Sequence, residues 1–293
     1  MEELIKLHSV TKDYGRNKGV FDTSFSIMRG EAFGFLGPNG AGKTTTIRMI
    51  LGFISPDAGK VSVAGYDAFS DRHHIMKNVG YLPAEINFFP SMSGNDFLDF
   101  MANLWGLSDF SYRKQLLALF DMDASVKLKR MSKGMKQKIA IVAAFMHRPD
   151  LFVLDEPTSG LDPLMQHRFN ELILQEKQRG ATFLLSSHNF DEVERTCDRI
   201  AIIKSGKMMA VDNIDVLKRN RMHQFTLTFS DALAATDFIS HTSYRVVSQS
   251  DAQLTLTVDG DINDFLKDLP DKKIINLQSD KLSLEELFMQ YYQ

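Results

Sequence analysis

The chain has 293 residues, of which 44% are hydrophobic and 24% are charged, and its formal net charge is −3. This composition is typical of a globular protein with one large domain, or with one large and one small domain. A charge so close to balance does not favour a protein that binds nucleic acid through a broad basic surface.

The single cysteine, Cys197, excludes an internal disulfide and fits a reducing compartment. Residues 1–6 contain no basic segment that leads into an apolar core, so we expect no signal peptide. The longest apolar run, at residues 140–146, falls far short of the ~20 residues that span a bilayer. We therefore expect a soluble chain in the cytoplasm.

The first quarter of the chain predicts strands around one short helix. Residues 3–27 alternate apolar and polar residues on either side of a turn at 14–19, which predicts two antiparallel strands. Residues 32–36 predict a short buried strand, 45–52 a helix and 60–63 a further strand. We expect an antiparallel β subdomain beside a strand–loop–helix unit.

The middle of the chain alternates strands with helices. The hydrophobic period changes to 3.6 between residues 91 and 123, which predicts an insertion of two or three helices. The other predicted helices are 71–78, 132–147, 164–178 and 190–197, and the predicted strands are 79–82, 151–154, 182–185 and 200–204. This alternation predicts a mostly parallel sheet covered on both faces.

The pattern shifts after a polar hinge at residues 218–221. Beyond it we expect strands at 224–229, 245–247, 254–258 and 274–277, and helices at 232–239, 262–269 and 283–292. The order βαββαβ resembles a ferredoxin-like unit. The predicted organisation is an α/β domain over residues 1–217, with a helical subdomain at about 90–147, and a small α+β domain over 218–293.

A phosphate-binding loop follows the strand at 32–36 and opens the next helix. Its sequence fits the pattern G-x-x-x-x-G-K-[ST], in which glycines let backbone N–H groups surround an anion at a helix N-terminus. Lys43 would reach the outer phosphates, and the Thr44 hydroxyl would hold Mg²⁺. The predicted nucleotide-binding residues are Gly37, Asn39, Gly40, Ala41, Gly42, Lys43, Thr44 and Thr45. The loop predicts binding of a nucleoside triphosphate.

Two carboxylates, Asp155 and Glu156, end the buried strand at 151–154. The carboxyl ends of parallel strands meet at one sheet edge, so we expect both acids near the phosphate loop. We assign Asp155 to the metal and Glu156 to the general base that activates the attacking water. Alone, an acidic pair after a strand is weak evidence, because turns also favour acids.

Three further motifs complete a recognisable set. They are the segment Met131–Met135 at a helix start, the loop Ser159–Asp162, and His188 after a strand. With the phosphate loop and the Asp155-Glu156 pair, they resemble the ATP-binding cassette family, the ATPase subunits of ABC transporters. The motifs occur in the family's order and span nearly all of residues 1–215. The resemblance implies an ABC ATPase fold, with ATP and Mg²⁺ as cofactors.

The resemblance assigns further roles. Tyr14 would stack on adenine, although a tyrosine in a turn is more often plain surface. His188 would contact the γ-phosphate beside Glu156, although a lone histidine at a strand end is usually structural. Ser132 and Gly134 would act in trans, facing the ATP of a second ATPase subunit in a homodimer or heterodimer.

Three positions depart from the family pattern. Lys133 and Met135 stand where the family commonly has Gly and Gln. Lys133 either adds positive charge near the γ-phosphate or, as most lysines do, points into solvent. Ala84 stands where the family has a Gln that senses the metal. Either the neighbouring Glu85 replaces that ligand, or the metal lacks it.

The resemblance also implies partners. A separate polytopic permease would dock on the helical insertion, with Phe88, Phe89, Phe97 and Trp105 as candidate contacts, although aromatics at helical spacing are usually core. The tail at 282–288 resembles ABC-2-type exporter ATPases. We therefore expect a transport ATPase, leaning to export, peripheral on the cytoplasmic face of the plasma membrane. The alternatives are an ATPase that remodels nucleic acid or ribosomes, and a scaffold that binds ATP without turnover.

Overall fold

The structure is a computed structural model that describes residues 2–219, 223–258, 262–269 and 273–281. It divides into two compact units, Met1–Ile214 and Asp215–Gln293. The sequence places the boundary at 217/218, close to this division. Within the described residues, no helix combines the length and the apolar character that crossing a bilayer requires.

An antiparallel sheet forms the N-terminal layer of the first unit. Its order is β2-β1-β4-β5. The strands are β1 (Glu3–Asp13), β2 (Gly19–Met28), β4 (Ala58–Val63) and β5 (Tyr66–Asp67). β1 pairs antiparallel with β2, as the alternating sequence predicts, and also with β4, for which the sequence predicts a strand but no partner.

A six-stranded sheet forms the centre of the first unit, and its strand order is β10-β9-β3-β8-β7-β6. The strands are β3 (Ala32–Leu36), β6 (Val79–Leu82), β7 (Leu151–Asp155), β8 (Thr182–Ser187), β9 (Arg199–Lys204) and β10 (Lys207–Asn213). Neighbours pair in parallel except β10, which is antiparallel to β9. Every residue of β3, β7 and β8 is buried, as expected of a parallel sheet covered on both faces.

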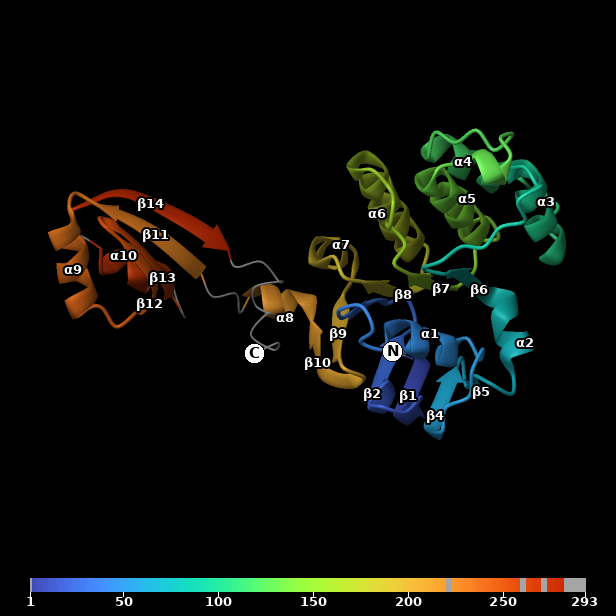
Figure 1. Cartoon of the computed structure of the whole chain (residues 1–293), viewed down its shortest axis with the longest axis horizontal. Coiled ribbons are helices and arrows are strands. Elements are labelled where there is room, and N and C mark those ends of the chain that lie inside the picture. The colour runs from blue at the N-terminus through green and yellow to red at the C-terminus, as the bar shows by residue number, and fades with distance from the viewer. Residues whose placement is uncertain (1, 220–222, 259–261, 270–272, 282–293) are drawn as a thin grey trace. The chain divides into compact units, whose positions relative to one another are not determined.

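Helices cover both faces of this sheet. They are α1 (Lys43–Ile50), α2 (Arg72–Ile75), α3 (Gly94–Leu104), α4 (Ser111–Leu119), α5 (Lys133–Phe145), α6 (Pro163–Gln178) and α7 (Phe190–Thr196), with 3-10 turns at Met76–Asn78 and Leu128–Arg130. In Figure 1, α5 and α6 lie on one side of β7 and β8, and α1 lies on the other. The insertion contains α3 and α4, so the expected two or three helices are two, followed by α5.

The helix starts that matter for the site follow simple capping rules. The Ser132 hydroxyl accepts from the Met135 N–H at the start of α5. Asp162 caps α6 in the same way, accepting from the Met165 N–H, and Pro163 occupies the first helical position. These caps fix the first residues of both helices, and therefore the loops that lead into them.

The second unit has a four-stranded antiparallel sheet of its own, in the order β12-β13-β11-β14. Its elements are α8 (Ile214–Arg219), β11 (His223–Phe229), α9 (Ala232–His241), β12 (Arg245–Ser250), β13 (Gln253–Val258), α10 (Ile262–Lys267) and β14 (Ile274–Lys281). Phe225, Leu227, Leu254, Leu256 and Phe265 build a separate core. After α8 the element order is βαββαβ, whereas the expected helix at 283–292 and residues 220 and 221 of the hinge lie outside the described residues.

Candidate nucleotide-binding and catalytic site

A cavity of about 450 Å³ opens where β3 and β7 end. It combines residues of four separate segments: the turn after β1, the loop before α1, the loop after β6 and the end of β7. The lining residues are Tyr14, Lys18, Gly19, Pro38, Asn39, Gly40, Gly42, Lys43, Thr44, Thr45, Ala84, Asp155 and Glu156. The fold therefore gathers the phosphate loop, the acidic pair and Tyr14 in one place, as the sequence predicts.

The glycines of the phosphate loop meet different demands. Gly40 and Gly42 have φ values of +78° and +113°, which side chains rarely adopt. A Cβ on Gly37 would lie 2.4 Å from the Ile203 carbonyl oxygen, so this glycine allows the loop to pack against β9. Gly37 and the buried Ala41 shape the loop from behind and do not line the cavity.

Lys43 is the buried cation of the site, only 6% exposed. Its Nζ donates to the Gly37 carbonyl oxygen at 2.6 Å and lies 3.2 Å from Glu156 Oε1. A buried ammonium is costly without such partners. The lysine thus joins the phosphate loop to the acidic pair.

Asp155 is almost fully buried and accepts hydrogen bonds on both oxygens. Thr44 Oγ1 donates to Oδ2 at 2.8 Å, and Ser186 Oγ donates to Oδ1. A hydroxyl and a carboxylate side by side at a phosphate-binding cavity are hard oxygen donors, which fit Mg²⁺. Thr44 and Asp155 are therefore the residues that would hold the metal.

Glu156 sits in the left-handed region at φ +52°, which is uncommon for a residue other than glycine. Its N–H donates to the Ser186 carbonyl oxygen at 3.1 Å. Its Oε2 lies 2.5 Å from Nδ1 of His188, whose side chain is 67% exposed. A residue held in this backbone conformation beside a histidine at the cavity suggests a functional role.

The segment Met131–Met135, which we call the signature, lies away from the nucleotide cavity of its own chain. Ser132 and Gly134 form the start of α5 and do not line the cavity. Lys133 is exposed, yet it does not simply extend into solvent, because its Nζ donates to Ser159 Oγ at 3.0 Å. This contact joins the start of α5 to the loop that follows β7.

The loop after β6 presents Ala84 to the cavity, whereas Glu85 is exposed and does not line it. Two lining residues, Lys18 and Gly19, were not predicted from the sequence. They lie in the turn beside Tyr14, where no motif marks them, and only the strand pairing of β1 with β2 brings them to the loop.

The four candidate docking aromatics differ in environment. Phe89 is 53% exposed. Phe88 packs edge-on against Phe97, and Trp105 stacks on His147 at 3.8 Å between ring centroids. Phe97 and Trp105 line an apolar cavity of about 420 Å³ that also touches Tyr81 of β6 and Ala140 of α5. Burial lowers the pKa of His147 to about 4, so it is neutral near pH 7.

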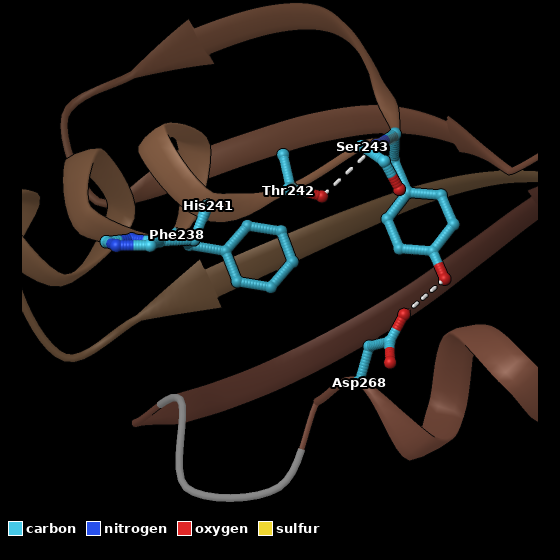
Figure 2. A pocket seen from close by; sticks show the side chains of 6 residues that line it. Phe238, His241, Thr242, Ser243 and Asp268 are labelled. Atoms are coloured by element: carbon cyan, nitrogen blue, oxygen red, sulfur yellow. Dashed lines mark hydrogen bonds between the residues drawn. The ribbon is translucent and has the colours of Figure 1, made fainter.

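The second unit has a hollow of about 280 Å³ (Figure 2). Its lining includes Phe238, His241 and Tyr244, and the Tyr244 hydroxyl donates to Asp268 at 2.7 Å. None of the predicted site residues lies in it.

Comparison with known proteins identifies the family. The family model described as ABC transporter matches residues 20–159. The linearmycin resistance ATP-binding protein LnrL of Bacillus subtilis (strain 168) is 37% identical over 213 residues, covering 71% of this chain and 68% of that protein. The bacitracin transport ATP-binding protein BcrA of Bacillus licheniformis is 34% identical, covering 79% and 76%. The chain belongs to the ATP-binding subunits of ABC transporters.

Solved structures agree with this assignment. An ATP-binding subunit of an ABC transporter is 33% identical with a TM-score of 0.68, covering 74% of this ABC subunit and 92% of that chain. The dimeric cassette MJ0796, in a post-hydrolysis state with ADP and phosphate, has a TM-score of 0.64 at 21% identity and shows the fold alone. The predicted ABC ATPase fold is thereby confirmed, and the chain is an ATP-binding ATPase. The ferredoxin-like resemblance of the second unit stays a prediction.

Proposed function

We propose that this ABC subunit hydrolyses Mg²⁺-bound ATP in the cavity between the phosphate loop and β7, and that the hydrolysis drives export through a separate permease. The observation that carries this proposal is the pairing of Glu156 with His188 and with the buried Lys43, beside the loop. A scaffold that only binds ATP has no need of a strained glutamate held between a lysine and a histidine.

The residues of the cavity divide the work of binding. Backbone N–H groups of the loop and the N-terminus of α1 would surround the phosphates, and Lys43 would exchange its carbonyl and carboxylate partners for phosphate oxygens. Tyr14, half exposed at the mouth, offers a ring on which adenine can stack. Thr44 and Asp155 would hold Mg²⁺, which neutralises developing phosphate charge when bound.

Glu156 is proposed as the general base. Its carboxylate would take a proton from the attacking water as the water bonds to the γ-phosphorus in line with the leaving ADP, whose bond to the γ-phosphorus breaks to give ADP and phosphate. His188 would hold the Glu156 carboxylate and contact the γ-phosphate. Its Nδ1 already lies 2.5 Å from Glu156 Oε2, so the contact between the two side chains exists before ATP binds.

The remaining signature residues support a pair of subunits. Ser132 and Gly134 lie outside the cavity of their own chain, at a helix N-terminus that can offer N–H groups to an anion. We propose that they cover the γ-phosphate bound by a second ATPase subunit, in a homodimer or a heterodimer. ATP would then hold the pair closed, and hydrolysis would release it.

The permease is proposed to dock at the apolar cavity between β6, α3 and α5, beside the exposed Phe89. A cavity with this lining suits an amphipathic segment of a partner. Relatives named for bacitracin transport and linearmycin resistance support export as the direction. Through the permease, the subunit would sit at the cytoplasmic face of the plasma membrane.

The decisive test replaces the proposed base. Glu156→Gln is expected to bind ATP normally and to lose turnover by ~10²–10⁴-fold, because the general base is absent. In the presence of ATP, this variant should also accumulate as a closed dimer, which size-exclusion chromatography would detect. Glu171→Gln, an exposed glutamate on α6, is the matched control and should behave as the wild type. Vigorous hydrolysis by Glu156→Gln would refute the assignment.

A detergent pull-down of the tagged chain from its host's membranes tests the partner. A stoichiometric polytopic protein, identified by mass spectrometry, is the expected companion. Recovery with ribosomes or nucleic-acid proteins alone would favour a remodelling ATPase and leave the catalytic assignments intact.

A further inference from the structure

A buried carboxylate that no motif marks lies behind the catalytic pair. Glu192, on α7, is 4% exposed and does not line the nucleotide cavity. Its Oε2 accepts from Ser187 Oγ at 2.8 Å and from Thr158 Oγ1 at 3.2 Å. A buried charge is destabilising unless it is well paired, so this position calls for an explanation beyond folding.

The two donors belong to the segments that carry the catalytic side chains. Ser187 ends β8 and directly precedes His188, and Thr158 follows Glu156 by two residues. One carboxylate oxygen therefore joins, through two side-chain hydroxyls, the segment that carries the proposed base and the segment that carries its histidine partner. The Glu156–His188 contact depends on the relative position of these same two segments.

The start of α7 holds Glu192 in place. Asn189 Oδ1 accepts from the N–H groups of Asp191 and Glu192, at 3.0 and 3.4 Å. Ser187 Oγ in turn accepts from the Asn189 N–H at 2.9 Å. Helix start, strand end and carboxylate thus form one hydrogen-bonded network on the far side of His188.

Retaining a carboxylate here has a cost. Burial, which outweighs the lowering by the hydroxyl donors, raises the pKa of Glu192 to about 7; the charge of Glu156 also raises this pKa and His188 lowers it. Its other oxygen, Oε1, is buried and has no hydrogen-bond partner among the described residues. The other charged or titratable groups that share its adjoining cavity of about 210 Å³ are Asp191, Arg195 and His167. An unsatisfied buried oxygen does not serve stability.

We propose that Glu192 is a positioning residue for ATP hydrolysis, which sets the approach of His188 to Glu156 by tying Ser187 to Thr158. This inference rests on the proposed roles of Glu156 and His188. Misplacement of a catalytic group by ~1 Å can reduce turnover by ~10²-fold, so a residue outside the cavity can control the rate.

The test uses the full chain with Glu192→Leu, which has a similar volume and removes both oxygens that can accept from Ser187 and Thr158. At saturating ATP, we expect turnover to fall at least ~10-fold while the affinity for ATP stays within about twofold, because the nucleotide contacts are untouched. Asp191→Asn, an exposed neighbour on α7, is the control and should hydrolyse as the wild type. Thermal unfolding of Glu192→Leu should stay cooperative, with a midpoint close to that of the wild type, which separates positioning from misfolding.

A second variant tests whether Glu192 acts through its hydrogen bond with Thr158. Thr158→Val removes one donor with little change in shape, so it should reduce turnover alone and add nothing in the Glu192→Leu background, where its acceptor is already gone. Wild-type turnover in Glu192→Leu, with Glu156→Gln inactive, would overturn the positioning role and leave the proposed function standing. If Glu156→Gln hydrolyses as the wild type does, the proposed function itself fails.

Discussion

At the scale of single residues, Lys43 links two parts of the site that lie far apart in the sequence. Its Nζ bonds the Gly37 carbonyl at 2.6 Å and lies 3.2 Å from Glu156 Oε1. The oxygens of a bound phosphate would form stronger, charge-assisted hydrogen bonds with this ammonium than the Gly37 carbonyl oxygen does. In the proposed cycle, ATP binding would therefore release the Glu156 carboxylate from Lys43, so that the carboxylate can face the attacking water.

Lys43→Ala should lose ATP binding, because the buried ammonium and its contacts to the outer phosphates disappear together. We expect the affinity to fall by ~100-fold or more, in line with loss of a charge-assisted contact of ~3 kcal/mol. Isothermal titration with ATP measures this directly, with Lys136→Ala on α5 as the control. Affinity left in the wild-type range would contradict the assignment of the loop.

Residues of the site were predictable where a chemical pattern marks them. Lys43, Thr44 and Asp155 follow from motif spacing, because the loop and the strand end impose fixed residue types. Lys18 and Glu192 were not predicted as site residues, since a lysine in a turn and a glutamate in a short helix belong to no recognisable motif. Their roles arise from neighbours that only the folded sheet brings together.

At the scale of elements, the start of α5 packs against the loop after β7. If Gly160 carried a Cβ, that atom would lie 3.1–3.3 Å from the aliphatic carbons of Lys133. If Gly134 carried one, it would lie 2.7 Å from the Gly160 carbonyl oxygen. The loop approaches the helix backbone this closely only because both positions are glycine. In the proposed pair of subunits, this junction carries the residues that reach the other nucleotide.

Lys133→Ala removes the hydrogen bond to Ser159 and the contact with Gly160. Because the bond is exposed, stability should change by less than ~1 kcal/mol. Turnover at saturating ATP should fall several-fold, since the signature and the following loop lose their mutual alignment. Steady-state ATPase assays with Lys136→Ala as control measure the effect, and equal rates for both variants would show that the junction is passive.

Most elements were predictable from periodicity, and the exceptions have physical causes. β10 and α8 were missed, because polar and apolar residues mix without a clear period between residues 207 and 219. The strand of β10 exists through its antiparallel pairing with β9, which is a tertiary effect. The expected helix at 71–78 is instead a short α-helix continued by a 3-10 turn.

At the scale of the whole molecule, the buried Glu192 makes stability depend on pH. Its pKa rises from 4.5 in the unfolded chain to about 7 in the folded one. Between these values the folded state holds more protons than the unfolded state, so stability falls as pH rises and levels off above pH ~7. The full effect of such a shift is about 3 kcal/mol.

Comparison of the wild type with Glu192→Gln isolates this contribution. From pH 5 to pH 8, the wild type should lose about 3 kcal/mol more unfolding free energy than the variant, which has no charge to bury. Urea unfolding followed by fluorescence of Trp105, the single tryptophan, reports on the first unit. If the unfolding free energy changed with pH in the same way in both proteins, the prediction would be wrong, because burial of the charged Glu192 would then cost no stability.

The two units have separate buried cores, one built around β3, α1 and β1 and the other around β11, β13 and α10. No residue belongs to both clusters as described. A substitution within the C-terminal cluster therefore removes no contact from the cluster around β3, α1 and β1. The packing that supports the phosphate loop thus uses none of the apolar side chains that fill the core of the C-terminal unit.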